Sequence, residues 1–465
     1  MKSEGVVGPE LGKAWAISTK ALLAILTLVF AAGAPKAQAQ SYQVLYNFGS
    51  NGGVLDGNVP NDGFIFDPAG NIYGTTAYGG TNCLAYGEDG CGTVFELSPS
   101  SGGWTETVLY SFCTTGYPNS CPDGAHPYDG LVRDSAGNLY GTTQMGGIDG
   151  GWGTVFELSP PTIAGGAWTE TVLYAFGGNT THDGCYPLAK VTFDGAGNLY
   201  GTASQCGTYG YGAVYELSQS GGGWVETNLH MFGGNLVTPH DGGTPKAAVE
   251  FSPYNNSGIL YGTTESFGFG GGTVFELTPS SGGQWSETIL QNFLRYPSPG
   301  SPISIVSFDP QGNLYGTFSE GGSGICGQYE GCGGVFELAL QAGGGYSTRV
   351  YDFDGVDGYA PTGGLAMDFA HHAAYGITEG GGQYVDACQG TGCGTAFSMN
   401  SRGSETVLYD FCSLANCADG NFQGRTFPVY PSGSLFLRSG ELFGAAPYGG
   451  AYNQGVVFEL AVPIE

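Results

Sequence analysis

The stretch GNLYGTT, at Gly137–Thr143, returns along the chain in slightly altered forms. It is followed by a second phrase, GTVFEL, as at Gly153–Leu158, and then by a third, VLY-x-F, as at Val172–Phe176. Each phrase occurs seven times in full or degenerate form. The aromatic residue of the second phrase recurs at intervals of 59 to 61 residues, by subtraction of the positions Phe95, Phe156, Tyr215, Phe275, Phe336, Phe397 and Phe458. A period this regular indicates stacked supersecondary units.

Each repeat contains short apolar runs rich in Val, Tyr, Phe and Thr, bounded by turn signals such as DSAGN at Asp134–Asn138. In the run before that turn, alternate positions are large and apolar, as at Val191 and Phe193, whereas the intervening positions are mixed and smaller. The mixed set comprises Ile65, Val132, Thr192, Glu250, Ser307 and Ala366. This period of two predicts a strand with one well-packed face, and the whole repeat accommodates four strands.

Seven such units predict an all-β fold, a seven-bladed β-propeller with four antiparallel strands per blade. Residues 40–465 would form this single domain from repeats of about 60 residues. A parallel β-helix is the alternative, but its coils would be about half as long. The last repeat ends after GVVFEL, Gly455–Leu460, without a fourth strand of its own. We therefore expect the strand at residues 44–48 to complete the last blade and close the ring.

The charge balance excludes two classes of partner. The chain carries 12 Lys and Arg against 40 Asp and Glu, a net charge of −28. Such a charge repels the phosphates of nucleic acid and the headgroups of anionic membranes. Neither is expected to bind this protein.

Residues 1–39 have the pattern of a secretory signal peptide. Lys13 and Lys20 precede an apolar run at residues 21–33, and a small-residue cleavage site follows at Ala37–Ala39. The run is shorter than the roughly 20 residues of a membrane-spanning helix, which disfavours the alternative of a membrane anchor. We expect cleavage after Ala39 and export by the Sec route, to the periplasm or the medium, with no membrane insertion after cleavage.

Twelve cysteines in an exported chain predict disulfides. Near neighbours suggest the pairs Cys83–Cys91, Cys113–Cys121, Cys326–Cys332, Cys388–Cys393 and Cys412–Cys417, which leaves Cys185 for Cys206. Zinc binding is the alternative, but no C-x-x-C motif occurs.

The repeated phrase GNLYGTT is itself best interpreted as structural. Tyr140 and its equivalents would pack between neighbouring blades, and Gly141 would allow a close approach that a side chain would prevent.

The phrases GNLYGTT, GTVFELSP (Gly92–Pro99) and GGWTETVLYSF (Gly102–Phe112) resemble the GloVer tandem-repeat family, the choice-of-anchor tandem repeat GloVer-containing proteins. The resemblance covers Tyr42 to Leu460 and implies a propeller-like, exported or surface-displayed bacterial protein. It implies no activity and no catalytic residue. Members end in differing C-terminal anchors, whereas this sequence stops at AVPIE, so release is expected rather than anchoring.

Because strands alternate in direction, the long loops of a propeller share one face, and all the cysteines fall in loops of that face. The loops leading into the blades carry a D-G-x-x-P phrase, which Asp419 keeps without the proline and which SPGSP replaces in the fifth repeat; the acids are Asp56, Asp123, Asp183, Asp241, Asp357 and Asp419. These carboxylates could ring the central channel and bind Ca²⁺ or a cationic or hydroxylated ligand. The alternative is turn chemistry, in which each aspartate caps its own backbone. Aromatic residues of the same face, Trp152, Tyr209 and Tyr384, add a possible surface for sugars.

Three functions fit this sequence. The leading hypothesis is an exported, monomeric module that binds an extracellular polysaccharide or protein and has no catalysis of its own. The second is a glycosidase or lyase that uses the carboxylates of the loops between blades. The third is a structural surface or matrix protein. No cofactor other than Ca²⁺ is suggested, and no G-x-S-x-G nucleophile motif occurs.

Overall fold

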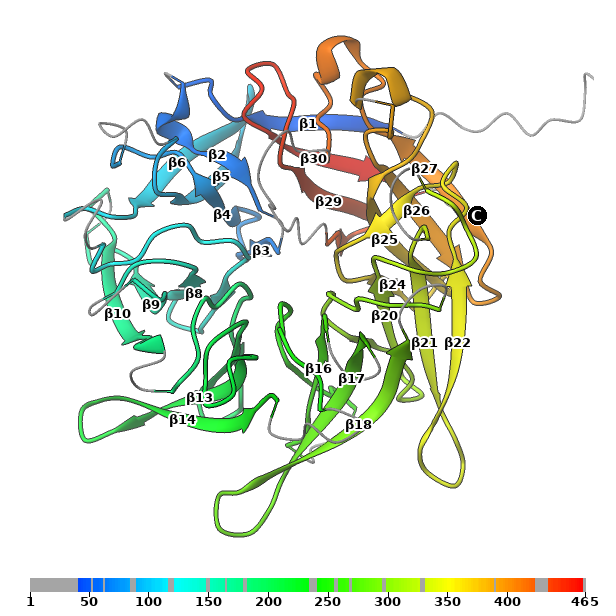
Figure 1. Cartoon of the computed structure of the whole chain (residues 1–465). Coiled ribbons are helices and arrows are strands. Elements are labelled where there is room, and N and C mark those ends of the chain that lie inside the picture. Colours follow the sequence, from blue (N-terminus) through cyan, green and yellow to red (C-terminus); the bar gives the residue numbers. More distant parts are fainter. Residues whose placement is uncertain are drawn as a thin grey trace, which may run out of the picture. The chain divides into compact units, whose positions relative to one another are not determined.

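The seven repeats form seven antiparallel sheets arranged as the blades of a propeller (Figure 1). The computed structural model describes residues 41–462 except 52, 62, 84–88, 116–120, 148–150, 164, 179–181, 234–240, 255–257, 267–269, 295–297, 327–330, 389 and 423–433. The predicted signal peptide, residues 1–39, and the predicted first mature residue, Gln40, lie outside the described residues.

Each blade contains four strands that pair in chain order. Blade 1 consists of β3 (Ile65–Phe66), β4 (Ile72–Tyr78), β5 (Thr93–Ser100) and β6 (Gly103–Ser111). Blade 2 consists of β7 (Val132–Arg133), β8 (Leu139–Thr143), β9 (Thr154–Ser159) and β10 (Thr169–Ala175). Blade 3 consists of β11 (Thr192–Phe193), β12 (Leu199–Ala203), β13 (Ala213–Ser220) and β14 (Gly223–Met231). Blade 4 consists of β15 (Glu250–Phe251), β16 (Leu260–Thr264), β17 (Gly270–Pro279) and β18 (Trp285–Leu294).

The remaining blades follow the same plan. Blade 5 consists of β19 (Ser307–Phe308), β20 (Leu314–Phe318), β21 (Gly334–Leu340) and β22 (Tyr346–Asp352). Blade 6 consists of β24 (Ala366–Asp368), β25 (Ala373–Gly380), β26 (Thr395–Asn400) and β27 (Glu405–Asp410). Blades 1 and 6 each gain one short extra strand, β2 (Asn58–Pro60) and β23 (Tyr359–Pro361).

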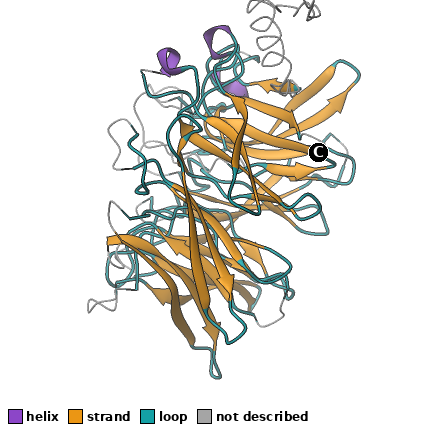
Figure 2. Ribbon diagram, turned by 90° about the vertical axis from the view of Figure 1, so that its right-hand side faces the viewer, coloured by secondary structure: helices purple, strands orange, loops and turns teal. Residues whose placement is uncertain are grey.

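In the described part of the chain, helix is confined to single 3₁₀ turns in loops (Figure 2): η1 (Val54–Asp56), η4 (Val385–Cys388) and η5 (Ala415–Cys417). Among the described residues, no helix is long and apolar enough to cross a membrane.

The first strand of the chain closes the ring, as predicted. Blade 7 consists of β28 (Phe436–Arg438), β29 (Glu441–Ala446), β30 (Val456–Ala461) and β1 (Tyr42–Asn47). β1 pairs antiparallel with β30, and Val44 faces Phe458. The Tyr42 ring also stacks on Tyr409 of blade 6, with 4.1 Å between ring centroids. The two ends of the domain are thus held in one sheet.

The core lies between neighbouring blades. Tyr140 and Phe176 of blade 2 pack with Val191 and Tyr215 of blade 3 in one buried cluster. The Tyr140 ring meets Phe193 edge-on, with 5.0 Å between centroids. This confirms that the tyrosine of GNLYGTT packs between blades.

The glycine and threonine of that phrase have equally specific positions. A Cβ on Gly141 would lie 2.7 Å from Phe156 Cζ, so no side chain fits there. Thr142 Oγ1 donates a hydrogen bond of 2.9 Å to the Ala189 carbonyl of blade 3. The equivalent threonines of blades 1, 3, 4 and 5 make the same bond, from Thr75, Thr202, Thr263 and Thr317 to the carbonyls of Asp129, Ala247, Ser304 and Gly363.

The middle leucine of VLY-x-F is a β-bulge. Val108 pairs with Phe95 and Tyr110 pairs with Val94, so the residue between them has no partner across the ladder. The fifth repeat has the shorter phrase VYDF, at residues 350–353, and its register runs without a shift.

Candidate functional site

The blades leave a cavity of about 360 Å³ at the axis of the propeller, lined by all seven blades. Its walls are the innermost strands and the residues just before them, where the loops between blades arrive. The cavity therefore lies at the end of the central channel that carries the loops between blades. Its volume falls within the roughly 300–1,000 Å³ of small-ligand sites.

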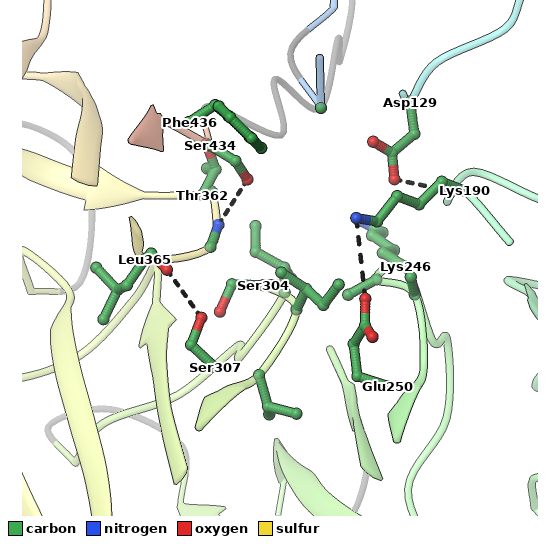
Figure 3. A pocket seen from close by; sticks show the side chains of 18 of the residues that line it. Asp129, Lys190, Lys246, Glu250, Ser304, Ser307, Thr362, Leu365, Ser434 and Phe436 are labelled. Carbon is green, nitrogen blue, oxygen red and sulfur yellow. Dashed lines mark hydrogen bonds and ion pairs between the residues drawn. The ribbon is translucent and has the colours of Figure 1, made fainter. Parts of the chain in front are cut away.

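One wall of the cavity is charged (Figure 3). The backbone N–H of Lys190 donates to Asp129 Oδ2 at 2.8 Å, and Lys190 Nζ lies 3.8 Å from Glu250 Oε1. A second lysine, Lys246, lies 2.6 Å from Glu265 Oε1, and its side chain is 8% exposed. Blades 2, 3 and 4 thus bring two ammonium groups and several carboxylates to one side of the channel.

Burial shifts the pKa values of the two acids of this wall, Asp129 and Glu250. It raises the pKa of the Asp129 carboxyl, and the nearby Lys190 ammonium opposes that rise. Burial likewise raises the pKa of Glu250, again opposed by Lys190. Each acid therefore depends on the lysine between them to remain ionised.

The opposite wall carries hydroxyl groups among apolar side chains (Figure 3). Ser307 Oγ donates to the Leu365 carbonyl at 2.8 Å, and Ser434 Oγ accepts from the Gly364 N–H at 2.9 Å. Ile305 and Phe436 supply apolar surface nearby. The cavity can therefore offer hydrogen bonds, charge and an apolar face to one ligand.

The sequence contained a signal for this cavity, but the search for motifs missed it. After residue 40 the sequence has only two lysines, Lys190 and Lys246, and both line it. Glu250 and Ser307 belong to the mixed set of alternate positions in the first strand.

The six aspartates predicted from the D-G-x-x-P phrase do not form a ring around the channel. Asp56, Asp123, Asp183, Asp241 and Asp419 are buried, and each lies beside the outermost strand of the preceding blade. Asp123, for example, accepts bonds from the Tyr110 hydroxyl at 2.8 Å and the Thr114 N–H at 3.0 Å. Asp357 accepts from the N–H groups of Asp354 and Gly355 in its own loop. The aspartates anchor their loops, because a buried carboxylate needs such donors, and binding of Ca²⁺ by them stays a prediction.

The predicted aromatic residues occupy two kinds of position. Trp152 packs against Tyr186, with 5.5 Å between ring centroids, and joins the cluster between blades 2 and 3. Tyr209 and Tyr384 are exposed in loops, at 51% and 41%. Trp152 is partly buried, so Tyr209 and Tyr384 are the most exposed of the three.

All six predicted disulfides are present: Cys83–Cys91, Cys113–Cys121, Cys185–Cys206, Cys326–Cys332, Cys388–Cys393 and Cys412–Cys417. The first two bridges lie against each other, as do the last two. They brace adjacent loops of neighbouring blades.

Comparison with known proteins supports the repeat assignment. The profile of the Gloeobacter/Verrucomicrobia repeat matches residues 34–192, 151–387 and 270–463. No curated protein matches the sequence. A solved protein of unknown function from Dyadobacter fermentans DSM 18053 is 11% identical, with a TM-score of 0.43 over 92% of this chain and 100% of that chain.

Two further solved structures are similar in fold. An ancestral GH74 enzyme is 12% identical, with a TM-score of 0.50 over 87% of this chain and 48% of that chain. The hydrazine synthase of Kuenenia stuttgartiensis is 14% identical, with a TM-score of 0.45 over 76% of this chain and 80% of that chain. At these identities the likeness concerns the fold alone.

Proposed function

The chain belongs to the Gloeobacter/Verrucomicrobia repeat family, and on that premise we propose that it is an exported binding module whose central cavity receives the end of an extracellular polysaccharide. One observation carries the proposal. The cavity at the channel mouth combines charged groups on one wall with hydroxyl and apolar groups on the other. Sugars use both kinds of contact, since their ring faces are apolar and their hydroxyls need donors and acceptors.

The lysines support a ligand site over a purely structural role. A chain with a net charge of −28 gains little from placing its only two lysines after residue 40 in one channel unless something binds there. A site that pairs each ammonium with a carboxylate suits a hydroxylated ligand with a polar or acidic terminal unit, because the ammonium groups can donate hydrogen bonds to it and the carboxylates can accept them from its hydroxyl groups.

Export is part of the proposal. Six disulfides are typical of proteins that fold in an oxidising compartment. The signal-peptide pattern of residues 1–39 agrees with this, and extracellular glycan would then be within reach.

The test is a glycan array probed with residues 40–465, produced under oxidising conditions in calcium-containing buffer. We expect specific, saturable binding. We also expect Lys190→Gln and Lys246→Gln each to weaken that binding at least tenfold. Arg402→Gln, which removes an exposed charge elsewhere, is the matched control and should bind normally. A blank array, or binding that survives both lysine changes, contradicts the proposal.

The same two lysines provide an independent readout. Reductive methylation of the mature protein can modify only Lys190, Lys246 and the α-amine. A ligand in the cavity should protect both side chains, which mass spectrometry measures directly. Unchanged labelling in the presence of a saturating glycan would place its site elsewhere.

Polysaccharide cleavage is the second candidate, favoured by Asp129 and Glu250 on either side of Lys190. A carboxyl whose pKa is raised by burial, as both are, can serve as a general acid. This function predicts new reducing or unsaturated ends from a bound glycan, lost in Asp129→Asn and Glu250→Gln. Binding without product favours the module without catalysis.

A further inference from the structure

A cluster of three metal-ligating side chains lies at the interface between blades 3 and 4, apart from the central cavity. His230 is on β14, Asp241 is in the loop leading into blade 4, and Glu287 is on β18. His230 Nε2 lies 3.6 Å from Asp241 Oδ2 and 3.9 Å from Glu287 Oε2. The three side chains are only 18%, 7% and 11% exposed.

Four other interfaces show what is special about this one. At each of them a tyrosine stands in the place of His230, and its hydroxyl donates a hydrogen bond to the aspartate. The interface of blades 4 and 5 has Gln291 at this position and no such aspartate, and at blades 5 and 6 the Tyr351 hydroxyl donates to Glu337. Tyr46 bonds Asp56 at 2.7 Å, and Tyr409 bonds Asp419 at 2.8 Å. The glutamate also recurs, as Glu106 beside Asp56 and Glu170 beside Asp123. Only the interface of blades 3 and 4 replaces the phenol with an imidazole, which is a common metal ligand.

The imidazole makes no hydrogen bond to replace that of the phenol. Within the described part of the chain, His230 Nε2 and Glu287 Oε1 are inaccessible to solvent and have no hydrogen-bond partner. The distance of 3.6 Å to Asp241 is too long for a hydrogen bond. A buried imidazole nitrogen that lies beside two carboxylates without a hydrogen bond is costly, and a bound cation would satisfy all three groups.

The spacing of the three groups suits a metal ion. Their ligand atoms lie within 4.8 Å of one another. Tetrahedral bonds of about 2.0–2.2 Å to zinc would bring ligand atoms to roughly 3.3–3.6 Å apart, which requires each group to shift by less than about 1 Å. One imidazole nitrogen and two carboxylate oxygens form a set that zinc accepts, with water in the fourth position.

We propose that His230, Asp241 and Glu287 bind one divalent transition-metal ion of the zinc class, which links the outer strands of blades 3 and 4. The ion takes the place of the hydrogen bond that a tyrosine makes to the aspartate at four other interfaces. The site stabilises the propeller locally and is independent of the central cavity.

The experiment uses residues 40–465 in the oxidised form, with free thiols titrated to zero and metal removed by EDTA. Cobalt is added as a spectroscopic probe, and zinc binding is measured by calorimetry and by elemental analysis after dialysis. We expect one equivalent of zinc, visible cobalt absorption bands, and a melting temperature that rises with zinc concentration.

The decisive variant is His230→Tyr, which copies the tyrosine found at four other interfaces and should fold. It is expected to lose the cobalt bands and to weaken zinc binding at least a hundredfold. His371→Asn is the matched control, because it removes an exposed histidine that pairs with an acid, Asp368, in a turn of blade 6, and it should keep both signals. Glu287→Gln gives a second test, with loss of binding expected.

No uptake of either metal by the stripped protein overturns the proposal. Uptake that His230→Tyr or Glu287→Gln leaves unchanged also overturns it, because the ion would then be elsewhere.

Discussion

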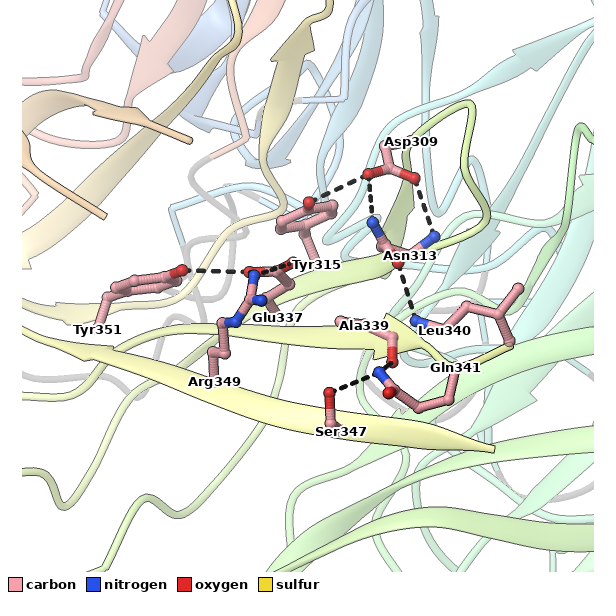
Figure 4. Close-up of polar contacts among 10 residues, drawn as sticks. All are labelled: Asp309, Asn313, Tyr315, Glu337, Ala339, Leu340, Gln341, Ser347, Arg349 and Tyr351. Carbon is pink, nitrogen blue, oxygen red and sulfur yellow. Dashed lines mark hydrogen bonds and ion pairs between the residues drawn. The ribbon is translucent and has the colours of Figure 1, made fainter. Parts of the chain in front are cut away.

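The Tyr315 hydroxyl donates a hydrogen bond of 3.1 Å to Asp309 Oδ2 across the turn between the first two strands of blade 5 (Figure 4). Asn313 fills the rest of the carboxylate, with its backbone N–H on Oδ1 at 2.9 Å and its Nδ2 on Oδ2 at 2.7 Å. In blade 6 His371 replaces the asparagine, with Nδ1 2.7 Å from Asp368 Oδ2. The phrase D-x-x-G-N-L-Y thus builds a turn that satisfies its own polar groups. This is why the chain repeats it.

Gly141 should tolerate no side chain. Gly141→Ala places a Cβ 2.7 Å from Phe156 Cζ and 3.0 Å from Leu131 Cδ2, and overpacking of this kind costs about 1–3 kcal/mol. Gly141→Val should cost more and lower the melting temperature markedly. The control is Gly195→Ala, where a Cβ meets nothing within 4 Å. Equal melting temperatures for the Gly141 and Gly195 variants would show that Gly141 is not a packing position.

The paired threonines of strands two and three should be energetically coupled. Thr143 and Thr154 share a buried hydrogen bond of 2.7 Å. Thr143→Ala leaves the Thr154 hydroxyl without this partner, which costs about 1–3 kcal/mol. The double change copies blade 3, where Ala203 and Ala213 face each other. A double-mutant cycle by chemical denaturation should show that the double variant loses less free energy of unfolding than the two single variants lose together. Additive losses would contradict the coupling.

Stability should fall from mildly acidic to alkaline pH. Burial, and to a lesser extent the Asp123 charge, raise the pKa of Glu170 to about 8. Burial and the Asp56 charge likewise raise the pKa of Glu106 to about 8. A carboxyl with a raised folded-state pKa contributes stability that is full below its unfolded pKa of about 4.5 and is lost as the pH rises toward 8.

Glu170→Gln tests this pH dependence. The amide is neutral at all pH values and can donate to Asp123 Oδ1, which has no hydrogen-bond partner among the described residues. The variant should melt several degrees above the parent at pH 8 and close to it at pH 4.5. Asp386→Asn, at an exposed position, is the control. A parent whose melting temperature rises from pH 5 to 8 in step with the variant would refute the explanation.

Removal of β1 should open the ring. A chain beginning at Gly49 lacks the strand that pairs with β30, and Tyr42 no longer stacks on Tyr409. We expect a large drop in melting temperature and rapid proteolysis at the exposed edge of β30, because an unpaired edge strand loses its ladder of hydrogen bonds. A chain beginning at Gln40 is the control. Similar protease resistance for both chains would mean that β1 is dispensable for closure.

Much of this structure was predictable from local patterns. The period of about 60 residues, the four strands, the closing strand at residues 44–48 and the six disulfides all depend on neighbours in sequence or on one register repeated seven times. In the structure the closing strand spans Tyr42–Asn47 instead of the predicted residues 44–48. The aspartates were harder to interpret, because Asp-Gly is equally a turn signal and a ligand signal, and their role as loop anchors became visible only in bonds such as that from the Tyr110 hydroxyl to Asp123.

The contacts between residues of different repeats depend on closure of the ring. Asp129, Lys190 and Glu250 belong to three successive repeats and are about 60 residues apart, so no local pattern brings them together. The same holds for His230 and Glu287, on the outer strands of adjacent blades. The sequence by itself determined the blades and their order, because strand pairing within a repeat is local. Only the tertiary structure decided which side chains meet at the axis and between blades, because those contacts form only when the seven sheets are arranged in one ring.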